Sequence, residues 1–238
     1  MTEVSVSPDA ETLARTVAGN LIDLIGSIQS TGRVPSIALT GGTIAVEIYR
    51  ALAQLDSESV DWTQVDFWWG DERYVAADSS DRNDRGAERA LLDVVGADPA
   101  RVHAMPAADE AHVDVATAAA AYGEELRTQG GGQFDLVLLG LGPDGHVASL
   151  FPGFPQLDAD DVAVAVTGSP KPPSDRITLT FGTLNRAREV WFVVSGEDKA
   201  SAVARALADH GSVEQTPARG ITCEHRTWWL DRPAAGAL

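Results

Sequence analysis

The sequence predicts one α/β domain built on a parallel or mostly parallel sheet. Short apolar segments alternate with longer amphipathic segments along most of the 238 residues, which is the order of strands and helices in such a sheet. Residues 134–139 are continuously apolar, as expected of a strand buried on both faces. We find no internal repeat and no long linker, so residues 1–238 are assigned to a single domain.

The predicted helices follow apolar residues at helical spacing and recognisable end signals. Ser7, Pro8 and Asp9 resemble a helix start, apolar residues then recur every three or four positions to Ile28, and Gly32 lies past the end. The other predicted helices are 43–55, 81–95, 109–127 and 196–208, with a short one near residues 140–145.

The predicted strands are short apolar or β-branched segments that end at turn residues. The tail 233–238 is expected to fray. The strands, in chain order, are 36–40, 65–69, 102–105, 134–139, 162–166, 177–181, 189–194 and 227–230.

Charge and composition exclude several functions. A formal net charge of −17 repels nucleic-acid phosphates, so no nucleic-acid partner is predicted. The sequence contains no run of about 18 apolar residues, so no membrane span is predicted. Cys223 is the only cysteine and cannot form an intrachain disulfide, and residues 1–9 lack a signal-peptide pattern, so we expect a cytoplasmic protein.

Four segments place glycine and polar residues after predicted strands. Ligands of open α/β sheets bind beyond the carboxyl ends of the strands, so these segments should meet at one edge. Gly41, Gly42 and Thr43 are expected to offer backbone N–H groups to a small phosphate, since they lack the spacing of a nucleotide site. The four segments are 40–43, 70–73, 140–146 and 195–199.

Two cations stand in these segments. Arg73 is suited to phosphate or carboxylate recognition, although a salt bridge to Asp71 or Glu72 is an equally simple interpretation. Lys199 is predicted in a first helical turn, where acidic residues are normally preferred. That position favours contact with an anion, but a solvated surface lysine is also compatible.

His146 is the main candidate for proton transfer. It lies in a glycine loop after a buried strand, and histidine exchanges protons near neutral pH. Asp144 could orient the histidine or bind substrate. The remaining four histidines have no such setting, and we expect structural or surface roles for them: His103, His112, His210 and His225.

Other catalytic arrangements lack support in the sequence. There is no G-x-S-x-G elbow for a serine hydrolase and no H-E-x-x-H or paired Cys/His spacing for zinc. Asp71, Glu72 and Asp144 could collect Mg²⁺, but nothing in their spacing requires it. No cofactor or metal is therefore predicted.

Several of these segments resemble one enzyme family. Residues 139–152, LGLGPDGHVASLFP, are similar to the signature of the 6-phosphogluconolactonases, and residues 66–73, DFWWGDER, resemble their strand followed by an acidic-arginine segment. Residues 39–43 match an early glycine loop in which many members carry serine where Thr40 stands. Later matches are 169–173, 176–178 and 196–200, so the resemblance runs from about residue 37 to residue 206.

This resemblance implies a Rossmann-like fold with helices on both faces of a mostly parallel sheet, shared with glucosamine-6-phosphate deaminases. It also implies metal-independent hydrolysis of 6-phosphoglucono-δ-lactone to 6-phosphogluconate in the oxidative pentose phosphate pathway. His146 matches the proposed general base and Arg73 a substrate-contacting arginine. We expect a phosphorylated sugar lactone as the partner, no nucleic acid or membrane, and a monomer.

The hypothesis for the chemistry follows from these residues. His146 deprotonates a water that attacks C1 of the lactone, and loop N–H groups or a cation stabilise the oxyanion. The sequence does not distribute the three cations Arg73, Arg176 and Lys199 between phosphate and oxyanion. The predicted site comprises catalytic His146, Arg73 and Asp144 and substrate-binding Gly41, Gly42, Thr43, Asp71, Glu72, Gly142, Gly145, Arg176 and Lys199.

Two alternatives remain at this point. An amino-sugar-phosphate deaminase/isomerase would need a glutamate where Phe151 stands, and the acidic segment of that family ends in tyrosine instead of Arg73. A non-catalytic sugar-phosphate sensor would usually append a DNA-binding helix pair, for which the first predicted helix has neither a partner nor a basic face.

Overall fold

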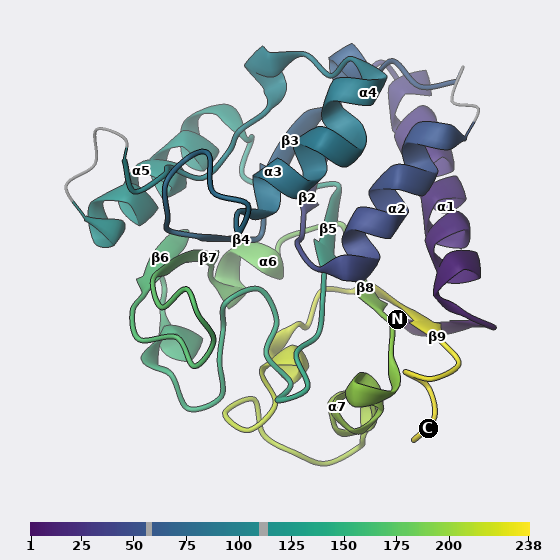
Figure 1. Ribbon diagram of the computed structural model, residues 1–238, viewed down its shortest axis with the longest axis vertical. Helices are drawn as coiled ribbons and strands as arrows, with labels where there is room; N and C mark the ends of the chain where they lie inside the picture. The colour runs from purple at the N-terminus through teal and green to yellow at the C-terminus, as the bar shows by residue number, and fades with distance from the viewer. Residues whose placement is uncertain (56–58, 110–113) are drawn as a thin grey trace.

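The fold is organised by a six-stranded, fully parallel sheet. The computed structural model describes residues 1–55, 59–109 and 114–238. The strand order is β1-β9-β8-β5-β2-β3, and every neighbouring pair is parallel (Figure 1). The mostly parallel α/β fold that the sequence predicts is confirmed. The strands are β1 (Thr2–Ser7), β2 (Ser36–Leu39), β3 (Asp66–Trp69), β5 (Leu136–Leu139), β8 (Glu189–Val194) and β9 (His225–Asp231).

A second, antiparallel sheet of three strands was not predicted. Its order is β4-β7-β6, with β4 at Asp71–Arg73, β7 at Arg176–Leu179 and β6 at Ala163–Val166. The chain leaves the first sheet at Gly70, whose carbonyl accepts a hydrogen bond from the Leu179 N–H at 2.9 Å. The register then pairs Arg73 with Arg176, so the second sheet brings two distant arginines together.

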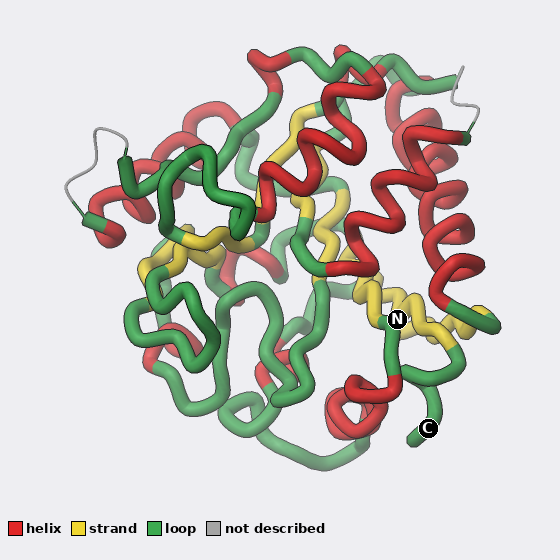
Figure 2. Tube along the Cα trace, viewed as in Figure 1, coloured by secondary structure: helices red, strands yellow, loops and turns green. Residues whose placement is uncertain are grey.

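Helices cover the parallel sheet from two sides. Figure 1 shows α1 and α2 together on one side, while α5 lies on the other beside β6. A π-helical turn at Glu88–Leu92 joins α3 to α4. Figure 2 shows the loops gathered below the sheet. The helices are α1 (Ala10–Ser30), α2 (Thr43–Gln54), α3 (Asn83–Ala87), α4 (Asp93–Val95), α5 (Val115–Gln129), α6 (Phe181–Leu184) and α7 (Ala200–Leu207).

Two buried tyrosines secure the ends of strands where the chain turns toward the loops. The Tyr49 hydroxyl accepts from the Thr40 N–H at 3.0 Å and donates to the Thr40 carbonyl at 2.8 Å. The Tyr122 hydroxyl does the same for the backbone of Trp69, at 2.9 and 3.1 Å. Each hydroxyl thus satisfies a backbone donor and acceptor that the sheet does not pair.

Several element predictions are wrong. Residues 2–7 form a strand along β9, and Asp9 rather than Ser7 caps α1. Of the predicted strand 102–105, only Val102 makes an isolated bridge, to Phe67. Residues 140–145 form the predicted glycine loop, but no helix begins within residues 140–154, because hydrogen bonds close the loop on itself. Ala234 in the tail is fully buried, so the tail is anchored.

The prediction of a helix from residue 109 extends over residues 110–113, which lie outside the described part of the chain. The described helix begins at Val115, where the Asp114 carboxylate accepts a hydrogen bond from the Thr117 N–H at 2.7 Å. No helix among the described residues is long and apolar enough to cross a membrane.

Candidate active site

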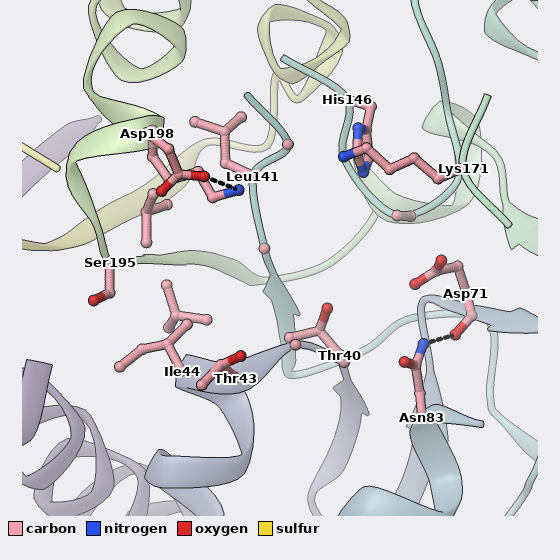
Figure 3. Close-up of a pocket in the computed structure, with 18 of the residues that line it drawn as sticks. Thr40, Thr43, Ile44, Asp71, Asn83, Leu141, His146, Lys171, Ser195 and Asp198 are labelled. Atoms are coloured by element: carbon pink, nitrogen blue, oxygen red, sulfur yellow. Dashed lines mark hydrogen bonds and ion pairs between the residues drawn. The ribbon is translucent and has the colours of Figure 1, made fainter. Parts of the chain in front are cut away.

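The carboxyl ends of β2, β3, β5 and β8 surround a cavity of about 500 Å³ (Figure 3). All four predicted loops contribute to its wall, as the parallel topology requires. The structure therefore brings together most of the predicted site. The predicted residues that line the cavity are Gly41, Gly42, Thr43, Asp71, Arg73, Gly142, His146, Arg176 and Lys199.

His146 and Asp144 form a directly bonded pair. The His146 Nδ1 atom lies 2.5 Å from Asp144 Oδ1, and the imidazole rests against the Phe151 ring at a centroid distance of 4.6 Å. The His146 side chain is only 14% exposed, and Asp144 stands behind it, outside the cavity lining. Asp144 is thus placed to orient the histidine.

The ionisation of Asp144 fixes the histidine tautomer. Burial opposes ionisation of the carboxyl, but the hydrogen bond and charge of His146, with a contribution from Lys171, outweigh it and lower the pKa of Asp144 to about 2. An ionised carboxylate only accepts hydrogen bonds, so Nδ1 must carry the proton. The neutral imidazole therefore presents an unprotonated Nε2, the form that can act as a base.

Gly142 is required by this pair. A Cβ atom there would lie 2.0 Å from His146 Nδ1 and 2.4 Å from Asp144 Oδ1, closer than real Cβ contacts allow. The Gly142 N–H also donates to the His146 carbonyl, and the Gly145 N–H to the Gly142 carbonyl, both at 2.9 Å. Gly145 itself has a φ of +92° and does not line the cavity, so its glycine serves the turn.

Arg73 lines the cavity without the salt bridge considered from the sequence. In the described part of the chain it forms no ion pair with Asp71 or Glu72. Its NH1 nitrogen instead donates to the Asp81 carbonyl at 2.6 Å and to Asn83 Oδ1 at 2.8 Å. The guanidinium charge is therefore not cancelled by a bound carboxylate.

Glu72 does not line the cavity, and we do not retain it as a substrate ligand. Its side chain is buried and accepts hydrogen bonds from the backbone N–H groups of Arg73 (2.8 Å), Asn83 (2.7 Å) and Asp84 (2.9 Å). Burial, reinforced by the negative charge of Asp84, raises the pKa of Glu72 to about 7 despite these hydrogen bonds. Its position identifies it as a cap for α3.

Asp71 faces the cavity and is held from behind. Its Oδ2 atom accepts a hydrogen bond from the Ser149 hydroxyl at 2.6 Å, which ties β4 to the loop that carries His146. That loop also contains Ala148, a cavity residue with a φ of +49° that is uncommon for a side chain. The backbone near His146 is therefore held in an unusual conformation by contacts on both sides.

The cations converge on the cavity from separate elements. Arg176 is 4% exposed, and its guanidinium donates to the carbonyls of Pro173 (3.2 Å) and Lys171 (3.0 Å). Burial lowers the pKa of Arg176. Lys199 pairs with Asp198 at 3.0 Å. Figure 3 shows Lys171 extending toward His146, and burial lowers the pKa of Lys171, partly offset by the Asp144 carboxylate.

The sequence prediction missed six polar cavity residues, although one signal was available. The chain has only two lysines, Lys171 and Lys199, against sixteen arginines, and both lysines line the cavity. Asn83 had no such signal because it lies far in sequence from the glycine loops. The missed polar residues are Thr40, Glu47, Asn83, Lys171, Ser195 and Asp198.

Two backbone features complete the site. Gly42, with a φ of +101°, precedes α2 without a side-chain cap, so the first N–H groups of that helix have no intrahelical partner. Asp231 at the end of β9 fixes the loop after β8, by accepting from the Ser195 hydroxyl at 2.5 Å and the Gly196 N–H at 3.1 Å. Among the described residues, no group of three or more His, Cys, Asp or Glu is arranged to hold a metal.

Comparison with known proteins identifies the family of the chain. The sequence profile of the glucosamine-6-phosphate isomerases/6-phosphogluconolactonase family matches residues 8–229. The chain belongs to this family. The 6-phosphogluconolactonase of Streptomyces coelicolor is 44% identical, with the alignment covering 99% of this chain and 94% of that protein.

Solved structures of this family share the fold over the whole chain. The 6-phosphogluconolactonase of Trypanosoma brucei matches with a TM-score of 0.86 at 30% identity, covering 100% of this chain and 99% of that one. A monomeric glucosamine-6-phosphate deaminase matches with a TM-score of 0.84 at 21% identity, covering 99% of this chain and all of that one. The latter likeness shows the fold alone, so the activity must be argued from the site.

Proposed function

We propose that this protein hydrolyses 6-phospho-D-glucono-1,5-lactone to 6-phosphogluconate in the oxidative pentose phosphate pathway. The observation that carries the proposal is the His146–Asp144 pair beside a cavity lined by four cations, Arg73, Arg176, Lys171 and Lys199. The full-length similarity to proteins named 6-phosphogluconolactonase supports it. The four cations offset the repulsion that a net charge of −17 exerts on a negatively charged substrate.

The chemistry needs a base and a stabilised oxyanion, but no covalent nucleophile. Nε2 of His146 takes a proton from water while the water oxygen attacks C1 of the lactone. The carbonyl oxygen becomes an oxyanion, for which Lys171 is the cation that extends toward the histidine. The C1–ring oxygen bond then breaks as the histidine returns its proton to the leaving oxygen. The product is the open-chain acid.

The phosphate is assigned to the opposite part of the cavity. The uncapped start of α2 at Gly42 and Thr43 offers backbone N–H groups, and Lys199 and Arg73 supply positive charge. Arg176 also lines the cavity and is paired in register with Arg73 in the second sheet. This division leaves His146 and Lys171 at the lactone carbonyl, with Lys199, Arg73 and the start of α2 at the phosphate.

The deaminase/isomerase alternative is disfavoured at one position. Phe151, which stands where that family continues toward a glutamate, is fully buried and packs on the His146 ring. It supplies no acid or base for ring opening and aldose–ketose chemistry. Lactone hydrolysis needs no second acid at this place, since a lactone is already an activated acyl group.

The test is a time-resolved lactone assay above the spontaneous background, with glucosamine 6-phosphate as a second substrate. We expect lactone turnover, no ammonia release, and a loss of about 100- to 10,000-fold in His146→Ala. His210→Ala, an exposed histidine outside the cavity, is the matched control and should retain full activity. Unchanged turnover in His146→Ala would remove this residue from the mechanism.

We also propose that the protein acts as a cytoplasmic monomer folded as one domain. The lone Cys223 is compatible with a reducing compartment. Light scattering coupled to gel filtration gives the mass in solution, and a dimer would contradict the monomeric state. A second unfolding transition would contradict the single domain.

A further inference from the structure

Steric contact with Asn83 explains why position 41 is a glycine. A Cβ atom there would lie 1.8 Å from Asn83 Oδ1 and 2.4 Å from Asn83 Cγ, so any side chain would displace the asparagine. The backbone of Gly41 does not demand glycine, because its φ is not in the left-handed region. The space above Gly41 is therefore occupied by a protein side chain.

Asn83 uses its amide to connect two cavity residues. Its Nδ2 donates to the Asp71 carbonyl at 2.9 Å, and its Oδ1 accepts from Arg73 NH1 at 2.8 Å. The residue is 6% exposed, and Figure 3 shows it below Asp71 at the cavity edge. Both ends of the amide are engaged, so its orientation is fixed.

Glu72 fixes the backbone at both Arg73 and Asn83. A single carboxylate oxygen, Oε1, accepts the backbone N–H groups of both Arg73 and Asn83, at 2.8 and 2.7 Å. This fixes the start of α3 against β4, so the arginine and the asparagine leave the backbone side by side. The side-chain bond between them follows from that placement.

We infer that Asn83 is a positioning residue that fixes the Arg73 guanidinium in the cavity, and that position 41 is glycine to leave room for Asn83. Arginine carries a long, flexible side chain, and holding it in advance removes an entropic cost from substrate binding. The other contact of NH1, the Asp81 carbonyl at 2.6 Å, lies in an exposed turn. Without Asn83 that single contact would hold NH1.

The kinetic consequence rests on the proposed function, in which Arg73 contacts the substrate phosphate. The competing explanation of Gly41 is that the missing side chain lets the phosphate approach the backbone. The two explanations differ in whether Gly41 and Asn83 act through one another. A double-mutant cycle distinguishes them.

The first cycle combines Gly41→Ala with Asn83→Ala. We expect each single variant to lower kcat/KM by about 10- to 100-fold, mostly through KM, and the double variant to be no worse than the poorer single one. Additive losses would show that alanine at 41 obstructs the ligand itself and would overturn the inference.

The second cycle places Asn83→Ala in an Arg73→Ala background. If Asn83 acts through the arginine, its removal should cost less than about threefold once Arg73 is absent. An undiminished loss would mean that Asn83 merely supports the fold or contacts substrate directly, and either result would overturn the inference. Should Asn83→Ala not fold, Asn83→Ser, whose hydroxyl is too short to reach Arg73, replaces it in both cycles.

A binding measurement separates this inference from the proposed activity. Calorimetric titration with 6-phosphogluconate reports anion affinity without turnover, and the same coupling between positions 41, 73 and 83 should appear there. A wild-type protein that binds the product but does not hydrolyse lactone would contradict the proposed function alone. Independent effects on product affinity would contradict the positioning role even in an active enzyme.

Discussion

Replacing Asp144 by asparagine isolates the charge behind the histidine. The substitution keeps the size of the side chain and an acceptor for His146 Nδ1, which lies 2.5 Å away, but removes the negative charge. The ordinary pKa of 3.8 falls to about 2 in the folded protein, a shift of about 2 units or roughly 2.5 kcal/mol. The ionised carboxylate beside the ring stabilises the imidazolium that forms during water attack.

The stabilisation expected from the Asp144 charge is smaller than this energy, because the carboxylate is partly exposed to solvent. Asp144 is 34% exposed, and water screens such a pair, so about 1 kcal/mol is the appropriate figure. The transition state for water attack should therefore lose about 1 kcal/mol of stabilisation in Asp144→Asn, or about fivefold in kcat/KM. Turnover at neutral pH should fall at least tenfold, because asparagine can also present an N–H and select the wrong tautomer.

The assay is stopped-flow lactone hydrolysis between pH 5 and pH 9, with the spontaneous rate subtracted at each pH. Nitrogen NMR of the imidazole in wild type and variant reports the tautomer directly. The reasoning is refuted if the neutral rate is unchanged, or if the wild-type histidine carries its neutral-form proton on Nε2. The exposed Asp160→Asn serves as a control for the loss of one negative charge.

Three further outcomes follow from the same structure. Gly142→Ala should lower kcat/KM at least 100-fold by displacing the catalytic pair, whereas Gly19→Ala, which meets open space on α1, should not; equal activities would contradict the steric argument. The free energy of unfolding of the wild type should fall between pH 4.5 and about 7, because the unfolded Glu72 carboxyl ionises near 4.5 while the folded one keeps its proton. Urea unfolding at each pH should show no such pH dependence in Glu72→Gln. Tyr49→Phe should cost about 1–3 kcal/mol in urea unfolding by leaving the Thr40 backbone groups unpaired, and a smaller loss would mean that water replaces the hydroxyl.

The sequence by itself determined the parallel sheet and the edge at which the site lies. Strand and helix periodicities are local, and parallel strands joined through helices must end at the same edge. Gly42, His146 and Lys199 could therefore be assigned to one cavity before any distance was known. Arg73 was assigned to the same edge on the same grounds, and the family resemblance added Arg176.

Only the tertiary structure decided how these residues act. The antiparallel sheet depends on pairing between β4 and β7, about a hundred residues apart, and no local pattern encodes that register. In the resulting structure the Glu72 side chain is buried and Asn83 lies against Gly41. Gly41, which the sequence suggests for a phosphate, and Gly142, predicted to bind substrate, both lie where a Cβ atom would collide with another side chain, because steric need is set by whichever residues folding brings together.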